Sequence, residues 1–329
     1  MKIDFVVLWV DGSDKKWQEE KMNFTGIPAK ENDVRYRDWG LMRYWFRAVE
    51  KNAPWVNKIY FVTWGHIPEW LNTTNSKLKV VNHRDFIPEE YLPTFNSNSI
   101  ELNIHRISDL SEHFVYFNDD MLVNNYVGPE DFFENGLPKA SAVMSVFTPT
   151  IINDQFQHCL CNDIAFMNTH FHKKDVIRRN LKKWYNPVYG KYILKNIYNY
   201  FQRGSFSMIQ NFHMASSMLK STYNKVWELE PELLHNTSKN KLRTHFDVNQ
   251  YIMTYYDIGT GRFSPRTPEF GRYYELKNNN TALLNDISEG KHKMICINDS
   301  ASIEDIEHIQ KELIDAFEKR YPDKSSFEI

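Results

Sequence analysis

The stretch Phe114-Val115-Tyr116-Phe117-Asn118-Asp119-Asp120 decides the fold class expected for this chain. Its first four residues are apolar or aromatic, which is typical of a short strand buried on both faces of a parallel sheet. The strand runs directly into Asn118-Asp119-Asp120, and open α/β sheets bind their ligands beyond the carboxyl ends of their strands. Two adjacent carboxylates repel each other, and their oxygens suit Mg²⁺ or Mn²⁺. The same letters also suit an ordinary strand-to-loop turn, so the motif alone leaves both interpretations open.

Residues 1–130 repeat this alternation of strand and helix. Segments 3–10, 58–63 and 78–81 are further predicted strands, and segments 39–52 and 100–110 are predicted helices. The pattern predicts an α/β fold with a doubly wound, mostly parallel, Rossmann-like sheet flanked by helices. The first strand is not followed by Gly-x-Gly-x-x-Gly, and the chain contains no Gly-Lys-Ser/Thr. Dehydrogenases and P-loop hydrolases are therefore disfavoured.

Composition narrows the class of protein further. The formal net charge of −2 argues against nucleic-acid binding as the main function. Aromatic residues make up 15% of the chain, which suits a thick core and also sugar stacking. The three cysteines have no framework spacing, and no signal peptide or membrane-spanning run is visible. We expect a cytoplasmic protein that can also associate peripherally with the inner face of the plasma membrane.

Basic side chains cluster near the predicted ligand edge of the sheet. Arg35, Arg37 and Arg43 are predicted to bind phosphate, because guanidinium groups pair bidentately with phosphate oxygens. Arg47 is assigned a surface role. On the predicted helix 100–110, Glu101 and His105 share one face by their spacing. That pair could hold a substrate hydroxyl, or it could be an ordinary polar face.

The remaining chain divides by composition into a middle and a C-terminal part. We predict three parts: an N-terminal α/β nucleotide-binding part (1–162), a basic, mostly helical insertion carrying His213 (163–242), and a C-terminal part completing the site (243–329). Most charges of the insertion are expected to be solvated, and the alternative is a docking surface for an anionic acceptor. Near the C-terminus, Ser302 resembles a capping-box start. The helix that follows is expected to pack on the sheet and to end in a short disordered tail.

Four sets of segments carry a resemblance to a known family: 3–14; Arg35-Tyr36-Arg37-Asp38 through 53–56, 94–97, 105–107 and 117–120; Phe212-His213-Met214 with Arg243 and Asp247; and 295–299. In this order they resemble the first, second, third and fourth conserved blocks of the Stealth family. This family comprises bacterial hexose-1-phosphate transferases for capsular and exopolysaccharides and the catalytic part of the lysosomal-enzyme N-acetylglucosamine-phosphotransferase. The match to the first two blocks is specific, and the whole match extends in the right order over most of residues 1–299.

The resemblance implies transfer of a hexose 1-phosphate, or an N-acetylhexosamine 1-phosphate, from a UDP-sugar to an acceptor hydroxyl, with release of UMP. A divalent cation, Mg²⁺ or Mn²⁺, and arginines would stabilise the phosphate charge, and a general base would take the hydroxyl proton. The acceptor would be a glycan, for example one linked to a lipid diphosphate.

The resemblance also assigns roles to single residues. His213 would be the base, although composition alone favours an ordinary packed or surface histidine, and Asp120 and Asp11 would act beside it. Metal ligands would be Asp119, Asp120, Asn298 and Asp299. Phosphates and sugars would be bound by Arg35, Arg37, Arg43, Asn96, Glu101, His105, Arg106, Arg243 and Asp247. These side chains are expected to meet at one edge of a single sheet.

Two other functions remain open at this point. A metal-dependent glycosyltransferase passing on the sugar alone would use the same strand-end carboxylates. A non-catalytic glycan-binding protein would instead use the aromatic surplus.

Overall fold

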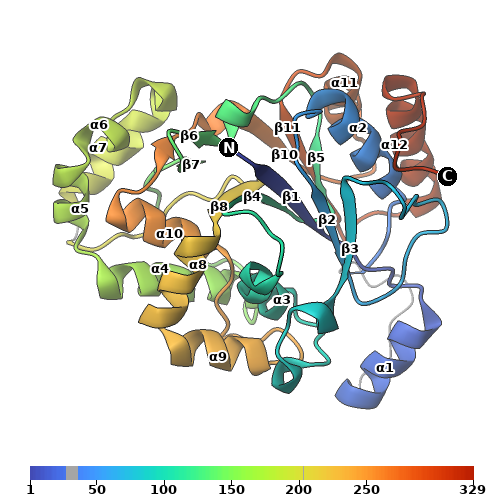
Figure 1. The fold of residues 1–329 in the computed structure, drawn as a ribbon. Coiled ribbons are helices and arrows are strands. Elements are labelled where there is room, and N and C mark those ends of the chain that lie inside the picture. Colours follow the sequence, from blue (N-terminus) through green and yellow to red (C-terminus); the bar gives the residue numbers. More distant parts are fainter. Residues whose placement is uncertain (27–35, 203) are drawn as a thin grey trace.

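The central sheet is parallel-rich, as the strand pattern predicted. The computed structural model describes residues 1–26, 36–202 and 204–329, so Arg35 lies outside the described residues. In these ranges, five strands pair in the order β3-β2-β1-β4-β8 (Figure 1). They are β1 (Ile3–Leu8), β2 (Ile59–Thr63), β3 (Leu78–Asn82), β4 (His113–Phe117) and β8 (Ser216–Leu219). The first four are parallel, whereas β8 runs antiparallel to β4.

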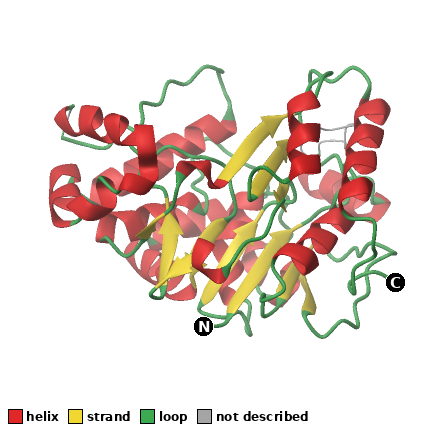
Figure 2. Cartoon of the chain, turned by 90° about the horizontal axis from the view of Figure 1, so that it is seen from above, coloured by secondary structure: helices red, strands yellow, loops and turns green. Residues whose placement is uncertain are grey.

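Side chains alternate between the two faces of this sheet because successive strand residues point in opposite directions. In β1, Phe5 and Val7 join one buried cluster and Val6 joins another. The first cluster is covered by α2 (Met42–Asn52), α11 (Thr281–Glu289) and α12 (Ile306–Arg320). The second is covered by α3 (Ser97–Asn103), α8 (Lys220–Leu229), α9 (Pro231–Lys239) and α10 (Tyr251–Thr260). Helices therefore lie on both faces of an α/β molecule (Figures 1 and 2).

A second sheet lies beside the central one, so the expectation that the site lies at one edge of a single sheet is wrong. It contains β10 (Gly271–Glu275), β11 (Met294–Asn298) and β5 (Met121–Val123), with β5 antiparallel to β11. The turn 118–120 thus leaves the central sheet and enters the second one. The carboxylates do not meet at an edge of one sheet, as expected, but where two sheets join.

The remaining elements are one N-terminal helix, a small third sheet and a group of helices around a third buried cluster. Near the N-terminus, α1 (Lys15–Thr25) is capped by Asp14, whose side chain accepts a hydrogen bond from Trp17 N. A third sheet holds β6 (Phe133–Glu134), β7 (Leu137–Ala140) and β9 (Ser264–Pro265). Helices α4 (Gln155–His170), α5 (Lys173–Arg179), α6 (Leu181–Trp184) and α7 (Ile193–Phe201) pack around a third buried cluster. Residues 163–242 also contribute β8 to the central sheet. No helix in the described ranges is long and apolar enough to cross a bilayer.

Two helix boundaries differ from the expected ones. Helix α3 ends at Asn103 and continues as a 3₁₀ turn over Ile104–Arg106. The helical spacing that would place Glu101 and His105 on one face is therefore lost. Helix α12 is capped by Asp305, which accepts from His308 N, and not by Ser302.

The C-terminal tail is ordered, contrary to expectation, because Arg47 holds it. Phe327 is buried, and the Arg47 guanidinium donates to both carboxylate oxygens of Glu328 at 2.8 and 3.0 Å. Arg47 is itself 6% exposed, so its predicted surface role is wrong. Its guanidinium charge is paired inside the protein with the Glu328 carboxylate of the C-terminal tail.

Candidate functional site

A cleft of ≈ 1220 Å³ opens where the two sheets join. It is lined by the segments that follow β1 and β4, by the start of α3, by the end of β11 and by residues 210–213. Its size is sufficient for a nucleotide-sugar together with part of an acceptor. The predicted site residues that line it are Arg37, Glu101, Asp119, Asp120, His213, Arg243, Asn298 and Asp299.

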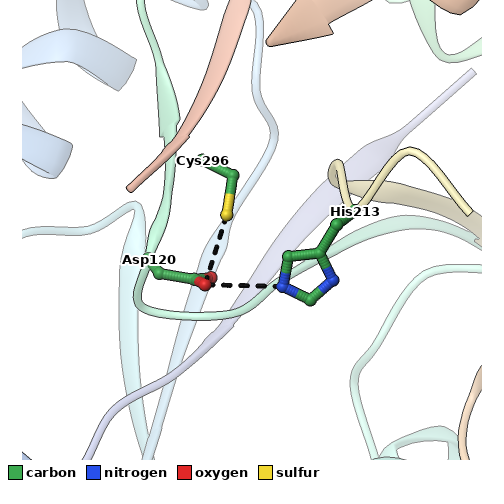
Figure 3. A group of neighbouring side chains, drawn as sticks. All are labelled: Asp120, His213 and Cys296. Atoms are coloured by element: carbon green, nitrogen blue, oxygen red, sulfur yellow. Dashed lines mark hydrogen bonds and ion pairs between the residues drawn. The ribbon is translucent and has the colours of Figure 1, made fainter. Parts of the chain in front are cut away.

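Asp120 and His213, which line the cleft, lie close to Cys296, which is fully buried (Figure 3). The Asp120 carboxylate oxygen Oδ2 lies 3.4 Å from His213 Nε2 and 3.2 Å from Cys296 Sγ. One possible ligand atom from each residue lies within 4.8 Å of the others, so the group could hold a metal ion. The three side chains come from the turn after β4, the segment before β8 and strand β11. Tertiary structure alone brings them together.

The backbone and a buried tyrosine fix the orientation of His213. Its φ of 49° is in the left-handed region, which is uncommon for a residue with a side chain. The backbone N–H donates to Asn211 Oδ1 at 2.7 Å, and Nδ1 lies 3.1 Å from the Tyr251 hydroxyl. Burial raises the pKa of Tyr251, so its hydroxyl stays protonated. In the tautomer with a proton on Nδ1, the ring donates to the Tyr251 oxygen, and Nε2, which faces the Asp120 carboxylate, is able to accept a proton.

Negative charge is concentrated beside this histidine. Enclosure by the cleft walls, together with Asp120 and Asp38, raises the pKa of Asp119 to about 7. Burial and Asp120 also raise the pKa of Cys296, which therefore remains a thiol and donates to Asp120 Oδ2. Such a cluster of carboxylates would be stabilised by a bound cation.

The oxygen atoms present fit a hard divalent cation. Asp120 Oδ1 is buried and has no hydrogen-bond partner within residues 1–26, 36–202 and 204–329. Asn298 is the last residue of β11 and Asp299 follows it directly. Ile297 N donates to the Asp120 carbonyl at 2.8 Å, so this segment lies beside the turn that carries Asp119 and Asp120. Carboxylate and amide oxygens are the ligands preferred by Mg²⁺ and Mn²⁺. The Cys296 thiol is a soft metal ligand and suits such a cation poorly. Its hydrogen bond to Asp120 Oδ2 instead orients the carboxylate.

Two arginines provide positive charge on the cleft walls. Arg37 Nη1 lies 2.9 Å from Asp299 Oδ1, which links a predicted phosphate ligand to a predicted metal ligand. Arg243 donates to Ser97 Oγ at 2.6 Å. Burial raises the pKa of Glu101, and the charge of Arg243 opposes that shift. Both arginines could therefore neutralise a bound diphosphate.

The structure places other predicted ligands away from the cleft. The Arg43 guanidinium lies over the ring of Trp70, and its Nε is 3.6 Å from Glu328 Oε2, so Arg43 contacts the C-terminal tail. His105 stacks on Tyr223 in the core, and burial lowers its pKa to about 3. Arg106 lies over the ring of Trp227. These three side chains, which were predicted to bind substrate, are therefore not among the residues that line the cleft.

Three further predicted residues support the walls of the cleft. Asn96 caps α3 and donates through Nδ2 to Asp247 Oδ2 at 2.8 Å, and both residues are fully buried. Asp247 also accepts from the Thr244 backbone and hydroxyl, which fixes the loop carrying Arg243. Asp11 lies at the rim, where its carboxylate accepts from Ser13 and its N–H donates to His66 Nε2 at 2.9 Å. Its charge helps to raise the pKa of Asp38, after the larger effect of burial.

Sequence reasoning missed the roles of Cys296 and Tyr251. Cys296 and Asn298 are two residues apart in a strand and therefore share a face, so the alternation in β11 could have indicated Cys296. No comparable local signal indicates Tyr251, since its partner His213 lies on a separate segment.

Comparison with known proteins agrees with the resemblance. Residues 1–26, 35–140 and 285–329 match the family models described as Stealth protein CR1, CR2 and CR4, conserved regions 1, 2 and 4. A capsular polysaccharide phosphotransferase, WcwK, of Streptococcus pneumoniae is 42% identical over 331 residues, covering 99% of this chain and 98% of that protein.

Two further relatives also match this chain over nearly the full length of both proteins. The exopolysaccharide phosphotransferase cps2G of Lactiplantibacillus plantarum is 44% identical, covering 99% of this chain and 96% of that protein. The receptor polysaccharide phosphotransferase WefC of Streptococcus oralis is 39% identical, covering 100% of this chain and 99% of that protein. Because relatives at this identity match over nearly their whole length, this chain belongs to the Stealth family.

Proposed function

We propose that this chain transfers hexose 1-phosphate, or N-acetylhexosamine 1-phosphate, from a UDP-sugar to a hydroxyl of a glycan acceptor, forming a phosphodiester in a capsular or exopolysaccharide. The general class, a phosphotransferase of polysaccharide biosynthesis, follows from its family and its relatives. The UDP-sugar donor and the phosphodiester product are proposed because carboxylates, arginines and His213 line one cleft.

The proposed reaction breaks the bond between the sugar-bearing phosphorus and the oxygen that bridges the two phosphates. The acceptor oxygen forms the new bond to that phosphorus, and UMP leaves with the bridging oxygen. His213 Nε2 is proposed to take the hydroxyl proton, since Tyr251 holds the other ring nitrogen. Arg37 and Arg243 would stabilise the diphosphate and the leaving UMP.

A divalent cation would be held by Asp119, Asp120, Asn298 and Asp299, and when bound it would stabilise charge on the phosphate oxygens. Within this proposal, residues 1–162 bind the nucleotide-sugar, 163–242 supply His213 and 243–329 complete the site. The strand order β3-β2-β1-β4 supports a Rossmann-like, glycosyltransferase-type arrangement of the sheet. The reaction is proposed to occur in the cytoplasm.

Phosphorus NMR of purified protein with a panel of UDP-sugars and a short acceptor glycan tests the proposal. UMP together with a phosphodiester signal is expected. Release of UDP would instead indicate transfer of the sugar alone, and binding without turnover would indicate a glycan-binding protein.

The site residues are tested by His213→Gln and Asp120→Asn. Each should lower kcat by at least about a hundredfold, because a base or a charge-stabilising group is lost. The matched controls His308→Gln and Asp315→Asn change exposed residues of α12 and should retain normal turnover. Full activity in either site variant would refute its assignment.

A further inference from the structure

Helix α7 exposes four large apolar side chains, while Ile193 and Tyr200 pack toward the third buried cluster. Leu194, Ile197, Tyr198 and Phe201 are 70%, 44%, 63% and 78% exposed. Their spacing of three, one and three residues places them along one face of the helix, here called the α7 face. Soluble helices normally turn such a face toward the core, so this one is available to a partner.

A buried amide side chain and a backbone carbonyl of α7 hold the helix in this orientation. Asn196 is fully buried; its Oδ1 accepts from Met144 N at 2.6 Å, and its Nδ2 donates to Ala142 O and Trp184 O at 2.9 and 2.7 Å. The Asn199 carbonyl accepts from Lys173 Nζ at 2.8 Å. Buried amides with satisfied hydrogen bonds are costly to displace. The outward direction of the α7 face is therefore built into the fold.

Positive charge surrounds the α7 face. Residues 171–202 contain eight lysines and arginines and a single acid, Asp175. Arg178 donates to the Tyr200 hydroxyl at 3.3 Å, and Trp184 O accepts from Asn196, so α5 and α6 both adjoin α7. The three helices form one end of the molecule (Figure 1). Arg178, Arg179, Lys182 and Lys195 are exposed there.

We propose that the α7 face docks the protein on an anionic lipid bilayer. Apolar side chains flanked by lysine and arginine are the combination that binds the interface of such a membrane without crossing it. Lys191 and Tyr192, directly before α7, line the cleft. Docking would therefore bring the cleft to the membrane surface, where an acceptor carried on a lipid diphosphate would be found. Only this last consequence rests on the proposed function, and membrane binding itself does not.

Vesicle sedimentation of the purified full chain tests the docking surface. The protein should bind vesicles of phosphatidylcholine with about one third phosphatidylglycerol, and should be released as salt rises. Leu194→Ser/Phe201→Ser and Arg179→Glu/Lys182→Glu should each lower the partition coefficient by at least about tenfold. Matched controls are Tyr126→Ser/Leu229→Ser for exposed apolar residues and Lys291→Glu/Lys311→Glu for exposed lysines, and these should bind as the wild type does.

Several results would overturn the docking surface. These are equal binding by the α7 variants and their controls, equal binding to pure phosphatidylcholine, and absence of binding. Loss of a wild-type dimer in the apolar variant, seen by analytical ultracentrifugation without vesicle binding, would assign the face to a second copy. Transfer to a water-soluble acceptor should be unchanged in the α7 variants, so failure of the docking surface is distinguishable from failure of the proposed reaction.

Discussion

At the scale of single residues, the site depends on side chains whose type alone does not reveal their role. Asp120 receives a hydrogen bond from the Cys296 thiol and faces His213 on its other side. The thiol therefore orients this carboxylate before any substrate arrives. Orientation of this kind is what lets a charged group act without reorganising during the reaction.

The role of Cys296 can be separated from that of a metal ligand. If the thiol orients Asp120, Cys296→Ser should keep Mn²⁺ affinity and turnover within about threefold, because a hydroxyl also donates. Cys296→Ala should lower kcat by about tenfold or more, because Asp120 loses that donor. Electron paramagnetic resonance titration of Mn²⁺ and steady-state rates provide the measurements. An equal loss of Mn²⁺ affinity in both variants would show that sulfur binds the metal.

At the scale of secondary-structure elements, the C-terminal tail holds helices together. Arg47 on α2 reaches Glu328 at the end of the chain and Glu318 on α12, at 2.8 and 3.0 Å. Its guanidinium also donates to Tyr321 O at 2.8 Å. One buried cation therefore links α2, α12 and the tail.

Breaking this contact should destabilise the protein in a graded way. Glu328 is almost fully buried, so Glu328→Ala should lower the free energy of unfolding by about 2–4 kcal/mol by leaving Arg47 less well paired. The Glu318 side chain is 50% exposed, and Glu318→Ala should cost less than about 1 kcal/mol. Urea titration measures both values. Equal effects of the two variants would contradict a tail held by a buried ion pair.

At the scale of the whole molecule, buried histidines make the stability depend on pH. Burial and the charges of Arg106 and Lys220 lower the pKa of His105 to about 3. Between that value and 6.5, the unfolded state binds a proton that the folded state does not. The contribution of His105 to stability is therefore fully present above pH 6.5 and is lost as the pH falls toward 3.

A His105→Phe variant should remove this contribution. Between pH 7 and pH 5 the wild type should lose about 2 kcal/mol of unfolding free energy more than the variant. The ring of the variant can still stack on Tyr223, which preserves the packing. Urea titrations at both pH values give the difference, and His308→Gln, which changes an exposed histidine, should follow the wild type. Identical pH dependence of wild type and His105→Phe would disprove a neutral buried imidazole.

Much of the fold was predictable because it depends on local patterns. Strands β1 to β4 follow from short apolar runs, and the polar residues after them follow from the end of each run. The second sheet was not predictable, because β5 is only three residues long and its partner β11 lies more than 160 residues away. The expectation of a single sheet edge was therefore wrong, although several of the expected carboxylates still line one cleft.

The sequence by itself determined the α/β class, the family, and the residue types at the strand ends, because these depend on periodicity and on short conserved segments. Only the tertiary structure decided which polar side chains share a cleft, which ones pack inside, and which helix turns its apolar face outward. The physical reason is that a charged or aromatic residue can be satisfied equally well by solvent, by a ligand or by a distant partner. Arg47 forms a buried ion pair with Glu328, which is distant in the sequence. Asp120 and His213, also distant in the sequence, lie side by side in an open cleft.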